Sequence, residues 1–257
     1  MQIGLVQMRC PKGEIEANLR AIAAHIEEAV RRGVEILCFP EMSITGYIDP
    51  ARWPEAVLPL DGPWVAQFIS LTAGREITVL AGLVEVNPAG KPFITQIAAQ
   101  SGSLVGVYRK TTIPEDEAPW FAPGGPVTVH HHGALNYGMS ICADIDNPDV
   151  FADAARQGAG IVFEAAAPGL YGSQESRDWQ VGFDWWREEC HTKLGRYARE
   201  YGIHIAVATQ AGRTVDEDFP GGGYVFAPDG SCIAATDDWS AGALYAPIDD
   251  QRLSSRS

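Results

Sequence analysis

The sequence lacks the features that mark membrane, secreted and nucleic-acid-binding proteins. No apolar run reaches the roughly 20 residues that a membrane-spanning helix needs. The N-terminal segment reads as a strand, without a basic region followed by an apolar one, so we expect no signal peptide. Basic residues are scarce: 19 lysines and arginines stand against 33 aspartates and glutamates, giving a net charge of −14. This balance argues against nucleic acid or a membrane surface as a partner.

Cysteine patterns typical of disulfide frameworks and zinc sites are also missing. The chain has five widely spaced cysteines and no CxxC pair, which predicts reduced thiols in a cytoplasmic protein. The run His130-His131-His132 could suggest a metal site, but consecutive strand residues point to opposite faces. Because no acidic or cysteine partner has ligand spacing, we expect exposed histidines near a turn, no metal and no cofactor.

What the chain does have is a regular alternation of apolar strands and amphipathic helices. Apolar residues at steps of three and four predict helices over 14–32, 61–71, 148–157 and 179–201. Short apolar runs predict strands over 3–8, 34–40, 77–86, 94–99, 104–108, 134–141, 161–163, 203–209, 224–227 and 231–235. No Pro/Ser-rich linker divides the chain. We therefore expect one α/β domain over 1–257, with a core to about 249, a short C-terminal tail and mixed sheets.

One strand ends in a cysteine whose surroundings pose an electrostatic problem. In YGMSICADID, Cys142 is followed by Asp144 and Asp146, and nearby carboxylates raise the pKa of a thiol. A reactive Cys142 therefore needs compensating charge from elsewhere in the chain. Two other strands end in ionisable side chains, since ILCFPE ends at Glu41 and LVGVYRK ends at Lys110. Ligands sit beyond strand ends in open α/β sheets, so these groups converge if the strands are neighbours.

The three side chains form a coherent catalytic set. Cys142 is expected to be the nucleophile, attacking an amide or nitrile carbon to form a covalent acyl-enzyme. Glu41 is expected to be the general base, and Lys110 to supply the positive charge that offsets the carboxylates and stabilises an oxyanion. The backbone N–H of Ala143 is the simplest second oxyanion donor. Asp144 is then left for a structural ion pair.

Three motifs give the chain a family resemblance. FPEMSITGY, YRK followed by E and F-x-P-G, and G-x-x-I-C-x-D resemble, in order and spacing, the signature segments of the nitrilase (carbon–nitrogen hydrolase) superfamily. The resemblance covers nearly the whole chain, with an amidase-like branch as the nearest match. It implies an α-β-β-α sandwich built on mixed sheets and a triad of Glu41, Lys110 and Cys142. It also implies a second glutamate, for which Glu117 fits best, although the neighbouring acidic residues leave the register open.

Departures from the family pattern bear on the substrate. Ala143 stands where the pattern usually has an aromatic residue, and Asp146 where it often has a basic one. Tyr47 and the segment Glu164, Ala165 and Ala166 follow strand ends, so we expect them to line the substrate pocket.

The sequence therefore predicts a cysteine-dependent hydrolase of a non-peptide C–N bond in a small amide or N-carbamoyl compound. The reaction would release ammonia or an amine and a carboxylic acid. A nitrilase acting on a nitrile is the nearest alternative, because the same triad could serve it. A non-catalytic ligand- or partner-binding protein on the same fold is an alternative of another class, which Ala143 and Asp146 keep open. We also expect a homo-oligomer, at least a dimer.

Overall fold

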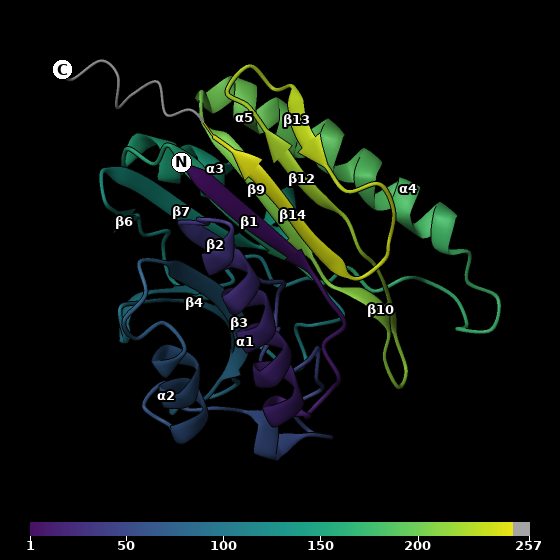
Figure 1. The fold of residues 1–257 in the computed structure, drawn as a ribbon. Helices are drawn as coiled ribbons and strands as arrows, with labels where there is room; N and C mark the ends of the chain where they lie inside the picture. Colours follow the sequence, from purple (N-terminus) through teal and green to yellow (C-terminus); the bar gives the residue numbers. More distant parts are fainter. Residues whose placement is uncertain (249–257) are drawn as a thin grey trace.

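The structure is a computed structural model that describes residues 1–248, and it is built around two six-stranded β-sheets (Figure 1). The first sheet has the order β14-β1-β2-β3-β4-β5. Its strands are β1 (Gln2–Gln7), β2 (Ile36–Cys38), β3 (Thr78–Glu85), β4 (Phe93–Gln100), β5 (Ser103–Arg109) and β14 (Gly242–Pro247). Parallel and antiparallel pairs occur together in it.

The second sheet is mixed in the same way and has the order β13-β12-β9-β8-β7-β6. Its strands are β6 (His130–His132), β7 (Leu135–Ile141), β8 (Ile161–Ala166), β9 (His204–Thr209), β12 (Gly223–Phe226) and β13 (Cys232–Ala235). A separate ribbon pairs β10 (Ala211–Arg213) with β11 (Asp218–Pro220).

Helices cover the outer faces of both sheets, which confirms the expected α-β-β-α sandwich (Figure 1). The first sheet carries α1 (Ile15–Arg31) and α2 (Pro63–Ser70). The second carries α3 (Pro148–Arg156), α4 (Trp179–Glu189) and α5 (Gly195–Tyr201), with a π turn, η3 (Cys190–Leu194), between the last two. Short 3-10 turns are η1 (Pro54–Ala56) and η2 (Cys142–Asp146).

The apolar pattern explains why these segments pack as they do. Most of the predicted stripe of α1 is buried, with Leu19, Ile22 and Ile26 at most 2% exposed, whereas Val30 at its end is 42% exposed. β3, β8 and β9 are buried along their whole length, as continuous apolar strands between two layers must be. The core between the sheets therefore fixes the strand ends from which the site is built.

Several boundaries differ from the predictions. The predicted helix 179–201 is interrupted by η3, and β14, which pairs antiparallel with β1, was not predicted. Its half-exposed residues give no clear apolar alternation. In β6, His131 alone is exposed, while His130 and His132 are partly buried and His132 Nδ1 hydrogen-bonds with Thr78 Oγ1 at 2.8 Å. The predicted C-terminal tail lies outside the described residues. Within the described chain, none of the helices combines the length and apolarity needed to cross a membrane.

Candidate active site

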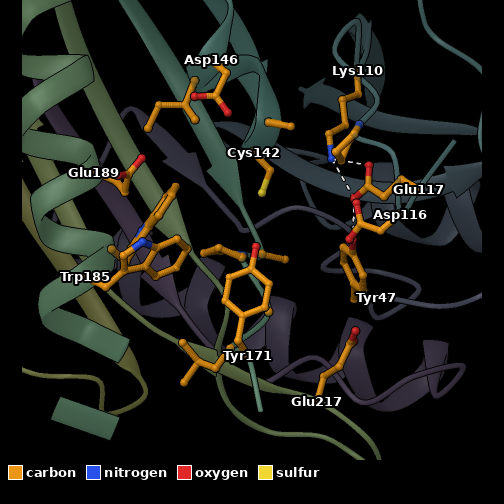
Figure 2. Close-up of a pocket in the computed structure, with 18 of the residues that line it drawn as sticks. Tyr47, Lys110, Asp116, Glu117, Cys142, Asp146, Tyr171, Trp185, Glu189 and Glu217 are labelled. Carbon is orange, nitrogen blue, oxygen red and sulfur yellow. Dashed lines mark hydrogen bonds and ion pairs between the residues drawn. The ribbon is translucent and has the colours of Figure 1, made fainter. Parts of the chain in front are cut away.

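Cys142 begins the η2 turn immediately after β7, in a backbone conformation that non-glycine residues seldom adopt. Its φ is +45°, in the left-handed region. Such strain is retained where the surrounding structure over-determines it, as it often does at functional sites. Figure 2 shows the Cys142 sulfur pointing into a pocket, with Lys110 and Glu117 on one side and Tyr171 and Trp185 on the other.

Glu41 reaches the site on a loop that lies tightly against β3. The loop continues the pairing of β2, since the Phe39 N–H donates to the Leu80 carbonyl at 2.8 Å. A Cβ on Gly82 would lie 2.3 Å from the Met42 backbone nitrogen, so a side chain at this position would push the loop away. Met42 itself has a φ of +49°. The turn that presents Glu41 is therefore strained, as is the turn that presents Cys142.

Lys110 lies at the centre of the charged groups. Its Nζ donates to Glu41 Oε1 at 3.0 Å and to Glu117 Oε1 and Oε2 at 2.9 and 2.7 Å. Lys110 and Glu41 have fully buried side chains and that of Glu117 is 6% exposed, so water screens these ion pairs very little. The Tyr47 hydroxyl donates to Glu117 Oε1, while Glu41 Oε2 has no hydrogen-bond partner.

Burial and neighbouring charges change the acidity of Glu41, Lys110 and Cys142. Burial raises the pKa of Glu41 to about 7, although the ammonium of Lys110 opposes the shift. Burial by itself lowers the pKa of Lys110, but the charges of Glu41 and Glu117 outweigh it, so Lys110 stays protonated. Burial, followed by the charge of Glu41, raises the pKa of Cys142, whereas Lys110 lowers it. The resting pair is therefore a neutral thiol beside a carboxyl that can accept its proton.

Asp144, next to the thiol, is held by neutral donors rather than by the structural ion pair that the sequence suggested. Its buried carboxylate accepts hydrogen bonds from the Tyr108 hydroxyl at 2.7 Å and the Thr111 hydroxyl at 2.8 Å. The backbone N–H groups of Thr112 and Ile141 donate to it at 2.8 and 3.1 Å. These four donors stabilise the negative charge and tie the η2 turn to the segment that carries Lys110.

Asp146 has a different environment at the rim of the site. Lys193 donates to it at 2.6 Å and also pairs with Glu189 at 2.5 Å. The Asp146 side chain is 60% exposed, so this ion pair lies in solvent. The basic partner that the sequence does not supply within η2 comes from the π turn η3.

The thiol opens into a cavity of about 340 Å³. Five of its lining residues were candidates from the sequence: Tyr47, Lys110, Glu117, Cys142 and Ala143. Others were missed, among them Asp116, Tyr171, Trp185, Trp186, Glu189 and Glu217. A second cavity of about 290 Å³ adjoins it and shares Tyr47, Asp116, Glu117 and Glu217. Aromatic rings and carboxylates thus form much of the wall (Figure 2).

The expected pocket positions of Glu164, Ala165 and Ala166 need correction. All three are fully buried within β8, and the cavity wall begins at Ala167. The reason is that β8 runs to Ala166, three residues beyond the predicted end at 163. The Ala167 backbone contributes a hydrogen bond that lowers the pKa of Cys142, so the segment after β8 does reach the thiol.

Some of the site residues that the sequence analysis did not predict could have been found from their position in the chain, and others could not. Thr111 and Thr112 directly follow Lys110, so they had to lie near the same strand end. Tyr171 and Trp185 come from a loop and a helix whose path over the cavity depends on tertiary packing. As for inorganic ligands, residues 1–248 hold no group of three or more histidine, cysteine, aspartate or glutamate side chains placed to bind a metal ion.

Comparison with known proteins places this geometry in context. The family model described as carbon-nitrogen hydrolase matches residues 2–256. A variant of the amidase from Nesterenkonia sp. AN1, with acrylamide added at its active-site cysteine, superposes with a TM-score of 0.83 at 23% identity. That match covers all of this chain and 96% of the amidase. At this identity it shows a shared fold.

Two longer relatives match most of this chain at similar identity. A glutamine-dependent NAD(+) synthetase of Thermotoga maritima is 25% identical over 238 residues, covering 91% of this chain and 39% of the synthetase. The chain therefore spans about two fifths of that relative's length. A Schizosaccharomyces pombe protein named "Probable nitrilase" is 23% identical over 253 residues, covering 96% of this chain and 88% of the relative.

Proposed function

The chain belongs to the carbon-nitrogen hydrolase family, and from that membership we propose that it is a cysteine-dependent hydrolase of small amides or N-carbamoyl compounds. Cys142 is the nucleophile, Glu41 the general base and Lys110 the electrostatic stabiliser. The observation that supports this proposal is that buried Lys110 pairs with Glu41 at 3.0 Å and with Glu117 at 2.7 Å, while Lys110 and Glu117 line the same cavity as Cys142.

Acylation follows from the protonation states. Glu41 removes the thiol proton as Sγ attacks the carbonyl carbon, so the carbon–sulfur bond forms without a standing thiolate in a buried site. The oxyanion is stabilised by the Lys110 ammonium and the Ala143 backbone N–H. When the tetrahedral intermediate collapses, Glu41 returns its proton to the leaving nitrogen, and ammonia or an amine departs as the C–N bond breaks.

Deacylation uses the same base a second time. Glu41 takes a proton from water, whose oxygen attacks the thioester carbon. The carbon–sulfur bond then breaks to release the carboxylic acid, and Glu41 returns its proton to Sγ to restore the thiol. Glu117 supports both halves by holding Lys110 in place, and Tyr47 in turn holds Glu117. We assign Glu117 and Tyr47 this positioning role.

The cavity wall favours a neutral or cationic substrate. Asp116, Asp146, Glu189 and Glu217 line it, together with the aromatic rings of Tyr171 and Trp185. Lys193 balances part of this charge, and Lys12 pairs with Glu217 at 2.7 Å. Arg177 also lines the cavity and pairs with Asp218 at 3.4 Å. Among the described residues, Asp116 is then a lining carboxylate without an ion pair. An anionic substrate would meet repulsion here, whereas an amide or ureide with an aromatic or ammonium group would not.

The test measures ammonia release from a panel of amides, N-carbamoyl compounds and nitriles. We expect wild-type activity on at least one amide or ureide, a loss below detection in Cys142→Ala, and unchanged activity in Cys232→Ala, whose partly exposed thiol lies on β13. Mass spectrometry should find the acyl group on Cys142. Activity that survives in Cys142→Ala would overturn the proposal.

Nitrile hydrolysis is the second candidate, favoured by the extended match to the Schizosaccharomyces pombe relative. Turnover of nitriles but not of amides would select it. A wild-type protein inactive on the whole panel, with Cys142 unreactive to iodoacetamide, would instead favour a ligand- or partner-binding role.

We further propose that the protein is a homo-oligomer, at least a dimer, working in the cytoplasm. Tyr171 and Val181 are 90% and 64% exposed beside Trp185, an unusual cluster for a surface that meets only water. Sedimentation at several protein concentrations tests this assembly, and a monomer at all concentrations would refute it.

A further inference from the structure

Glu164 is a buried carboxyl that the proposed mechanism does not use. It lies in the middle of β8, fully buried, and both of its carboxyl oxygens lack a hydrogen-bond partner. Its register partner on β7 is Ser140, whose hydroxyl is likewise buried and unpartnered. Two polar side chains on neighbouring strands thus lack hydrogen-bond partners, and one of them, Ser140, is two residues before the nucleophile in the sequence.

The side chain of Glu164 points away from the cavity, toward the helix layer. Side chains alternate along β8, so Glu164 faces the same way as Val162. A Cβ on Gly138, the register partner of Val162, would contact Ala154 of α3 at 3.1 Å. On the same face, Trp186 of α4 donates to Thr209 of β9 at 2.8 Å. Glu164 is therefore enclosed between the second sheet and its helices.

Comparison with Asp144 defines the state of this carboxyl. Asp144 accepts four hydrogen bonds, which stabilise a negative charge. For Glu164, the hydroxyl of Ser140 favours the ionised form, whereas the charge of Asp144 acts against it. Burial raises the pKa of Glu164 well above its ordinary value. A buried carboxyl with one neutral hydroxyl as its donor, acted on by the charge of an existing carboxylate, remains a neutral acid.

The other charges that act on Glu164 do not reverse this conclusion. From the first half of the chain, the Glu41 carboxylate opposes ionisation and the Lys110 ammonium favours it. These two groups are already paired with each other at 3.0 Å. From the helix side an ionisable neighbour is Cys190 at the start of η3, whose pKa burial raises and whose thiol a charged Glu164 would hold still more firmly in the protonated form.

We propose that Glu164 is a positioning residue: as a neutral carboxylic acid it hydrogen-bonds to Ser140 and fixes the end of β7, which presents Cys142. A protonated carboxyl can donate to the Ser140 oxygen and accept its hydroxyl proton, so the acid satisfies both orphaned groups without adding charge beside Asp144. The inference rests on the proposed function of Cys142.

Difference infrared spectroscopy tests the protonation state independently of activity. The wild-type protein at neutral pH should show the carbonyl stretch of a protonated carboxylic acid that Glu164→Gln lacks. Absence of this band from the difference spectrum would overturn the proposal, whether or not the protein hydrolyses any amide. The spectrum therefore separates a failure of this inference from a failure of the proposed function.

Kinetics test the positioning role. Glu164→Gln keeps a neutral donor and acceptor, so kcat should stay within about threefold of wild type. Glu164→Leu and Ser140→Ala remove the hydrogen bond in two ways, and each should lower kcat about tenfold through displacement of the sulfur. Ser140→Ala keeps the test decisive if the leucine variant does not fold.

The alkylation rate of Cys142 by iodoacetamide, followed against pH, supplies a readout that packing defects alone would not move. We expect Glu164→Gln to reproduce the wild-type profile, because neither side chain carries charge. A profile shifted to lower pH in Glu164→Gln would mean that an ionised Glu164 had been removed, and equal kcat in Ser140→Ala and wild type would exclude the positioning role.

Discussion

The two sheets repeat one arrangement of strands but contribute different chemistry. Counted from β14 to β5 and from β6 to β13, successive neighbours run antiparallel, parallel, parallel, antiparallel and antiparallel in both. β7 is followed by Cys142, whereas its counterpart β1 is followed by Met8. β2 leads to Glu41, whereas its counterpart β8 leads to Ala167. The repeated framework brings strand ends together, and the residue beyond each end determines what that end can do.

Each half of the chain also has a lysine that pairs with two carboxylates, but the two lysines differ in burial. In the first half, Lys110 bridges Glu41 and Glu117 with a fully buried side chain. In the second, Lys193 bridges Asp146 and Glu189 with a side chain that is 29% exposed. Both lysines make two ion pairs of similar length. Burial is what distinguishes a charge that alters reactivity from one that water screens.

Replacing each lysine by methionine should give the largest difference in stability and turnover between the two halves. Lys110→Met leaves two buried carboxyls without their cation, so the free energy of unfolding should fall by about 3 to 5 kcal/mol and turnover should be lost. Lys193→Met should cost less than about 1 kcal/mol and leave turnover within a fewfold of wild type. Urea unfolding and steady-state kinetics provide the measurements. Equal losses in the two variants would show that burial does not explain the difference between the ion pairs of Lys110 and those of Lys193.

Glycines on the two sheets offer a second, smaller contrast. In Gly82→Ala the new methyl would lie 2.3 Å from the Met42 backbone nitrogen, which cannot move without displacing the turn of Glu41. In Gly138→Ala it would meet the side chains of Ala154 and Val162 at 3.1 and 3.2 Å. We expect stability losses of about 3 kcal/mol and about 1 kcal/mol respectively, with turnover reduced in Gly82→Ala.

Thermal unfolding measures the loss of stability, and kcat measured at a temperature where each variant is folded measures the loss of turnover separately. A Gly82→Ala protein with unaltered turnover would contradict the view that close approach to β3 positions Glu41.

Much of the fold was predictable because its apolar patterns are local. The stripe of α1 and the strand before each candidate catalytic residue can be read from short windows, and three motifs in one order predicted the gathering of Glu41, Lys110 and Cys142. Their catalytic roles remain predictions. The end of β8 was missed because FEAAAP contains no strand breaker before Pro168, so the pattern did not mark where the strand stops.

Contacts between distant segments were beyond the reach of the sequence. Asp144 was assigned to an ion pair because its neutral donors come from Tyr108, Thr111 and Thr112, more than 30 residues upstream. Lys193 likewise reaches Asp146 from 47 residues downstream. Such partners depend on how two sheets and their helices pack, which no local pattern encodes.

The smallest predicted effect concerns pH and separates two adjacent carboxylates in the cavity wall. Because the pKa of Glu41 is raised to about 7 and the base must be ionised, kcat/KM should rise with pH through that value. The charge of Glu117 contributes to the rise in the pKa of Glu41. Glu117→Gln should therefore move the acidic limb to lower pH, even if it also lowers the maximum rate.

Asp116→Asn is the matched control for this shift, because Asp116 lines the same cavity but is exposed, and water screens its charge. The acidic limb of the Asp116→Asn pH profile should coincide with that of wild type when kcat/KM is followed from roughly pH 5 to 9, the range around the expected midpoint. A limb that stays in place in Glu117→Gln would mean that Glu41 is not the group whose ionisation controls the rate. A shift of equal size in both variants would mean that general surface charge, rather than the buried carboxylate beside Lys110, sets the acidity of the base.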